Sequence, residues 1–120
     1  VVQPERLIEV CAFLRDDPAL RFDLLSDVSA VDHYPDHPRF AVNYHLYSLV
    51  NNLELRLKVW LDGEQPHVPS VTGVWPGANW HEREVWDLMG VRFDGHPDPR
   101  RIFLPEDFLG YPLRKDAAQR

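Results

Sequence analysis

The chain has 120 residues, of which 44% are hydrophobic and 27% charged, and its formal net charge at pH 7 is -6. These values suit one globular domain, and the negative charge argues against a general nucleic-acid binder, which would carry a basic face. The single cysteine excludes an intrachain disulfide and a cysteine-ligated metal cluster. No apolar run approaches the roughly 18 residues that a membrane-spanning helix needs, so we expect no direct membrane span.

The first predicted elements are a helix over residues 4–14 and a strand over residues 22–31. Proline at position 4 suits a first helical turn, and an apolar stripe follows at helical spacing. The stripe consists of Leu7, Ile8, Cys11 and Leu14. Cys11 is expected to be a small buried residue within it. The strand is rich in apolar and β-branched residues but alternates poorly, and residues 33–38 follow it as a proline-containing turn.

The clearest pattern is a β-hairpin formed by residues 40–50 and 53–61. From Leu53 to Leu61 every second residue is apolar, and the residues between them are charged or aromatic. That period of two predicts a strand with one buried face and one wet face. Asn51-Asn52 is predicted to be a two-residue turn, because asparagine tolerates a positive φ.

A second helix is predicted over residues 80–89, within the stretch WHEREVWDLMG. Asn79 is a candidate N-cap, and Glu82 follows it at the spacing of a capping box. Gly90 is a candidate helix stop.

Two short extended pieces follow this helix, over residues 91–93 and 101–104. The resulting order of helix, strand, hairpin, helix and short strands contains no alternating βαβ series. It predicts an α+β domain of two layers, with an antiparallel or mixed sheet and two helices. We expect this domain to occupy residues 1–98 and an extended, loop-rich docking tail to occupy residues 99–120.

The charges of the second helix permit two interpretations. On a helical wheel His81 lies beside the apolar face, whereas Arg83, Glu84 and Asp87 lie opposite it. Two carboxylates three residues apart could form an acid–base pair with perturbed pKa values. The alternative is a solvated or partner-facing strip, in which Arg83 and Asp87 have the spacing of an ion pair. The arginine favours the second interpretation, because a nearby cation favours the ionised carboxylate.

Metal and nucleotide sites find little support in the sequence. The pairs His81 with Glu84 and His96 with Asp98 do not have the spacing of known zinc motifs. No glycine-rich nucleotide loop and no GxSxG nucleophile elbow occurs. Two small basic patches, at residues 100–101 and 114–115, are either solvated charge or arginine contacts with a partner's carboxylates.

One long run carries a family resemblance. Residues 68–116 read VPSVTGVWPGANWHEREVWDLMGVRFDGHPDPRRIFLPEDFLGYPLRKD. This stretch resembles the C subunit of the proton-pumping NADH:quinone oxidoreductase, respiratory complex I, in one uninterrupted order of motifs. LLSDVSAVD, residues 24–32, is compatible with the same family.

The resemblance implies a non-catalytic assembly subunit of the peripheral arm, with no catalytic, cofactor-binding or metal-binding residue of its own. FMN and the iron–sulfur clusters are then expected in partner subunits, and the quinone-site subunit (the D subunit of the complex) is the expected neighbour. The chain would lie on the cytoplasmic side of the cell membrane, as a peripheral part of a membrane complex that couples electron transfer from NADH to quinone with proton translocation.

The signature residues carried over from the family are expected to shape the helix and loop and to dock them to partners. They are Glu82, Arg83, Glu84, Asp87, Gly90, His96, Arg100, Arg101, Pro112, Leu113, Arg114, Lys115 and Asp116. Two alternatives stay open: the same scaffold in a membrane hydrogenase-type complex, or a stand-alone metal-dependent enzyme using His81, Glu84 and Asp87.

Overall fold

The computed structural model of the chain describes residues 1–98, 100–101 and 110–114. Its elements in chain order are η1 (Pro4–Arg6), α1 (Leu7–Asp16), β1 (Leu24–Asp32), β2 (Phe40–Ser48), β3 (Leu53–Leu61), β4 (His67–Pro69), α2 (Ala78–Met89) and β5 (Arg92–Asp94). The predicted α+β class is confirmed, with one antiparallel sheet and a separate parallel pair of strands. None of the helices in the described ranges combines the length and the hydropathy that crossing a bilayer requires.

The main sheet is an antiparallel meander in the order β1-β2-β3. The predicted hairpin is confirmed, with Tyr44 opposite Leu57 in the register. Its predicted two-residue turn is wrong, because β2 ends at Ser48 and four residues link it to β3. The poor alternation of β1 has a physical cause, since the register shifts between Leu25 and Asp27, as in a β-bulge.

The second sheet is a parallel pair of short strands in which Val68 of β4 faces Phe93 of β5. β5 corresponds to the predicted extended piece at residues 91–93. The sequence predicts loop where β4 lies, because three residues carry too little periodicity to reveal a strand. Of the second predicted piece, residues 102–104 lie outside the described residues, and Arg101 is in no strand.

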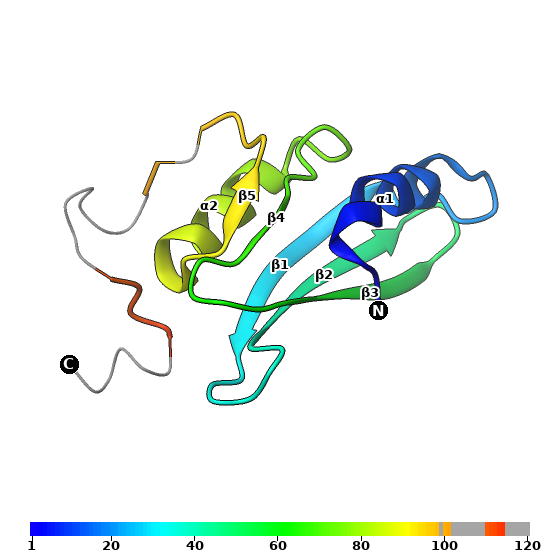
Figure 1. Cartoon of the computed structure of the whole chain (residues 1–120). Helices are drawn as coiled ribbons and strands as arrows, with labels where there is room; N and C mark the ends of the chain where they lie inside the picture. The colour runs from blue at the N-terminus through cyan, green and yellow to red at the C-terminus, as the bar shows by residue number, and fades with distance from the viewer. Residues whose placement is uncertain (99, 102–109, 115–120) are drawn as a thin grey trace.

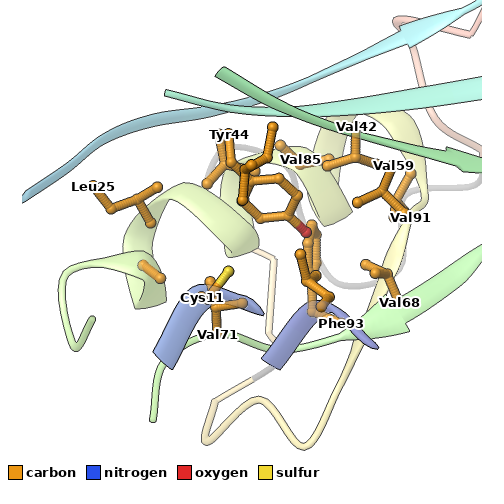
Figure 2. Close-up of a cluster of buried hydrophobic side chains, with 14 of the residues drawn as sticks. Cys11, Leu25, Val42, Tyr44, Val59, Val68, Val71, Val85, Val91 and Phe93 are labelled. Atoms are coloured by element: carbon orange, nitrogen blue, oxygen red, sulfur yellow. The ribbon is translucent and has the colours of Figure 1, made fainter. Parts of the chain in front are cut away.

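Both helices pack on one face of the main sheet, with α1 near one end and α2 beside the β4–β5 pair at the other (Figure 1). Between them lies one hydrophobic cluster, and the ring of Tyr44 reaches into its middle (Figure 2). Cys11 of α1 is fully buried there, as its place on the apolar stripe predicts. Ile8 is 49% exposed, so its assignment to the buried stripe is wrong.

The start of α2 differs from the prediction. The helix begins at Ala78, its N-cap is Gly77, and no side chain caps it. The predicted capping box is therefore wrong, because the preceding turn runs directly into the helix through a hydrogen bond from the Asn79 N–H to the Pro76 carbonyl. The predicted stop is confirmed: Gly90 has a left-handed φ of 74°, and its N–H donates to the carbonyl of Trp86.

Candidate functional site

The carboxyl group of Glu82 lies in the interior of the domain. The side chain is fully buried, and it accepts hydrogen bonds from the Ser70 hydroxyl at 2.6 Å and from the Val71 N–H at 2.8 Å. No lysine or arginine among the described residues forms an ion pair with it. Burial without a cation raises the pKa of Glu82 to about 7, although both hydrogen bonds act in the opposite direction.

His96 is the polar neighbour of this carboxyl group. Its Nε2 lies 4.0 Å from a Glu82 oxygen, and its side chain is only 3% exposed. Nδ1 accepts the N–H of Asp98 at 2.9 Å, so Nδ1 carries no proton. The proton is then on Nε2, which donates to the carbonyl of Asn79 at 2.9 Å. His96 therefore joins the loop after β5 to the first turn of α2, and both of its ring nitrogens are occupied by hydrogen bonds.

Asp87 is buried and paired, although the wheel places it on the solvated strip. Its side chain is fully buried, and Nε of Arg101 donates to it at 2.6 Å. Nη2 of Arg101 donates at 2.7 Å to the backbone carbonyl of Asp87 and at 2.8 Å to that of Gly110. The solvated-strip interpretation is therefore wrong for Asp87. Arg83 does not form the ion pair with Asp87 that their spacing permits among the described residues.

A second arginine completes this arrangement at the end of α2. Arg114 donates from Nε to the carbonyl of Met89 at 2.7 Å, and the N–H of Leu113 donates to the carbonyl of Leu88 at 3.0 Å. Arg101 and Arg114 both lie 4.9 Å from the ring centre of Tyr111. We call Arg101, Tyr111, Leu113 and Arg114 the C-terminal clasp. It satisfies backbone carbonyls that the last turn of a helix leaves without intrahelical partners.

Gly90 is required by the clasp as well as by its own backbone. A Cβ at this position would lie 2.6 Å from Nη2 of Arg114 and 2.6 Å from the ring of Tyr111. Its positive φ independently disfavours any residue with a side chain.

The remaining signature residues lie at the surface or outside the described part. Arg83 donates to the carbonyl of Arg100 at 3.2 Å, and Arg100 binds Asp98 through two hydrogen bonds of 2.7 and 3.0 Å. Glu84 is half-buried, and Pro112 and Leu113 are exposed. Lys115 and Asp116 lie outside the described residues.

The residues of the metal-enzyme alternative do not converge. His81 lies 3.8 Å from Asp27 of β1, whereas Asp87 faces Arg101 near the other end of the helix. Within the part of the chain that the structure describes, no three His, Cys, Asp or Glu side chains come together in a way that could hold a metal ion.

Comparison with known proteins assigns the chain to a family. The sequence profile of the family described as respiratory-chain NADH dehydrogenase, 30 Kd subunit, matches residues 1–120. The chain belongs to this family. The predicted resemblance is thereby confirmed.

Individual relatives of this 30 Kd subunit family agree with the match. The second C subunit of the NADH-quinone oxidoreductase of Rhizobium meliloti (strain 1021) is 61% identical over 115 residues, covering 96% of this chain and 63% of that protein. The corresponding C subunit of Roseiflexus sp. (strain RS-1) is 54% identical over 115 residues, covering 96% of this chain and 66% of that protein. A solved structure, Nqo5 of the trypsin-resistant fragment (1-134) in P63 form, has a TM-score of 0.72 at 39% identity, covering 81% of this chain and 78% of that one. The chain thus spans about two-thirds of the length of these two curated relatives.

The sequence did not reveal the residues that surround the buried carboxyl group of Glu82. Ser70 and the Val71 amide come from the loop after β4, and nothing in their local sequence marks them as partners of Glu82. Tyr44 is fully buried, and its hydroxyl has no hydrogen-bond partner among the described residues. Burial, with a contribution from the negative charge of Glu82, raises the pKa of Tyr44 well above its usual value. Burial similarly raises the pKa of Cys11 to about 12.

Proposed function

We propose that this chain is a non-catalytic structural subunit of the peripheral arm of a NADH:quinone oxidoreductase, on the cytoplasmic side of the cell membrane. Electrons from NADH would pass through FMN and iron–sulfur clusters in partner subunits toward quinone. The whole-length match to the 30 Kd subunit family carries this proposal. The quinone-site subunit, which helps to form the binding site for quinone, is the proposed neighbour.

The contacts of the signature residues support a structural role. Glu82 and Asp87 are both fully buried, which is unusual for carboxylates and points to internal partners. Each carboxylate makes internal contacts, since Glu82 joins α2 to the loop after β4 and Asp87 joins α2 to the C-terminal clasp. The two carboxylates therefore act as structural hydrogen-bond acceptors that hold α2 and the neighbouring loops in one arrangement.

The exposed residues of α2 support a role for this helix in binding partner subunits. Trp80 is 52% exposed, an unusual position for a large aromatic side chain. The guanidinium of Arg83 lies 5.9 Å from the ring centre of Trp80, and Leu113 of the clasp is 59% exposed. Tryptophan and arginine are enriched where protein interfaces form. These side chains support the proposal that partner subunits contact the domain at Trp80, Arg83 and Leu113.

The test is complementation in a host whose own gene for the 30 Kd subunit has been deleted. The full-length protein containing this chain is expressed with an affinity tag, and the membranes are assayed for NADH:quinone oxidoreductase activity. We expect activity to return and the tag to recover the quinone-site subunit with the other arm subunits. Recovery of the tagged chain as free protein, with activity still absent, would contradict the proposal.

A further inference from the structure

Two neighbouring hollows on the surface lie beside α2. The larger, about 660 Å³, extends from the loop before β4 to the C-terminal clasp. The smaller, about 300 Å³, lies between α2 and the loop after β5. Both are lined by Trp86, Arg92 and Asp94, so they are neighbours that share these three residues. We call the two hollows together the α2 groove, and Arg92 is one of the three residues that line both.

Most of the charged side chains that line the α2 groove have hydrogen-bond partners within the chain. Arg39 binds Asp32 through hydrogen bonds of 2.8 and 2.9 Å, and Asp94 accepts a hydrogen bond of 2.8 Å from His67. Arg83 and Arg114, which also line the groove, donate to backbone carbonyls.

Arg92 differs from these residues. Its side chain is exposed and makes no hydrogen bond or ion pair with any other residue in the described ranges. Its backbone N–H donates to the carbonyl of Pro66. Glu64, an exposed carboxylate, lines the larger hollow but not the smaller one. Among the described residues, the groove therefore offers one guanidinium without an internal partner, that of Arg92, and an acid at Glu64 that repels other acidic groups.

The apolar part of the groove lies beside this cation. Trp86 lines both hollows and lies 5.4 Å from Tyr111 between ring centres. Phe93 lines the smaller hollow, whose volume of about 300 Å³ has room for one large side chain. Tryptophan, tyrosine and arginine are enriched among the residues that dominate the energy of protein–protein contacts.

We infer that the α2 groove receives an extended segment of a neighbouring protein subunit, which places one carboxylate on Arg92 and one apolar side chain against Trp86 and Phe93. The inference rests on the proposed function, because it names the surface by which the chain would meet its partner. The available charge at Arg92 and the acid at Glu64 together select a segment with one acidic group over a polyacidic one.

The first experiment reverses the charge in the complemented strain. Arg92→Glu is compared with Arg92→Lys and with the matched control Arg56→Glu. Arg56 lies on β3, is exposed like Arg92, and also lacks a side-chain partner among the described residues. We expect Arg92→Glu to lower the amount of the quinone-site subunit recovered on the order of tenfold, and the other two variants to recover it as the wild type does. Equal recovery from Arg92→Glu and the wild type would overturn the inference and leave the proposed function intact. Failure of the wild type itself would overturn both.

A second experiment identifies the occupant. The chain has one cysteine, Cys11, and burial raises the pKa of that thiol to about 12. Gln65→Cys, at an exposed residue that lines the larger hollow, would therefore supply the readily reactive thiol and leave Arg92 in place. The purified complex is treated with a short thiol-to-carboxyl crosslinker, and the linked peptides are identified by mass spectrometry. A link to an aspartate or glutamate of another subunit would support the inference. A link to a second copy of this chain, a link only within the chain, or no link would overturn it.

Discussion

Replacing Glu82 by glutamine should change how the stability of the protein depends on pH. The folded chain holds the pKa of Glu82 at about 7, against an ordinary value of 4.5. A raised pKa means that the folded state prefers the protonated form. The stability that this preference supplies is complete below pH 4.5 and is lost as the pH rises to about 7. The difference between the two pKa values corresponds to about 3 kcal/mol.

Glu82→Gln keeps the size and a hydrogen-bonding head group but cannot ionise. We expect its free energy of unfolding to approach that of the wild type near pH 5 and to exceed it by up to about 3 kcal/mol near pH 8. The measurement is urea unfolding at several pH values, followed by tryptophan fluorescence. Glu84→Gln, at a half-buried position of the same helix, is the control for losing one carboxylate. A difference between Glu82→Gln and the wild type that stays constant from about pH 5 to about pH 8 would refute the reasoning.

Three further predictions concern the same helix and its neighbours. Gly90→Ala should lower the free energy of unfolding by about 1–2 kcal/mol because of the left-handed backbone alone, and by more because the new Cβ would approach other atoms to 2.6 Å. The control is Gly73→Ala, whose Cβ would meet nothing within 4 Å and which should change the midpoint of thermal unfolding little. Equal midpoints for the two variants would contradict the prediction. Asp87→Ala should cost about 3–5 kcal/mol in urea unfolding, because it leaves the guanidinium of Arg101 half-buried without its carboxylate, and a loss under about 1 kcal/mol would argue against that pair. Ser70→Ala removes a hydrogen bond that favours the ionised form of the buried glutamate, so its pKa should rise and the pH range of destabilisation should move upward; a downward move would count against the assignment.

The local sequence pattern predicts those elements whose structure is determined by residues close together in the chain. The strict alternation of residues 53–61 predicts β3, and the glycine after the apolar periodicity predicts the end of α2 at Gly90. The boundaries of the hairpin turn are harder to predict, because Leu49 and Val50 continue the apolar pattern although they are 66% and 64% exposed. Periodicity alone cannot distinguish an apolar strand residue from an exposed apolar turn residue.

The local sequence pattern could not predict the contacts of the candidate site, because the residues that make them are distant in the chain. A helical wheel assigns charged residues to solvent, but Glu82 meets donors from the loop at Ser70 and Val71, and Asp87 meets Arg101 after the following strand. Charged groups are buried when such partners exist, and only the fold brings the partners into place. The signature motif identified the family, whereas the inward direction of its charges required the tertiary structure.

The C-terminal clasp also bears on how strongly a partner could bind. Fixing the backbone of one residue costs roughly 1–2 kcal/mol in conformational entropy. Hydrogen bonds from Arg101 to Gly110 and from Arg114 to Met89 fix this stretch against α2 within the chain itself. That ordering cost belongs to folding and not to association, so a subunit that meets Tyr111 or Leu113 encounters a preorganised surface.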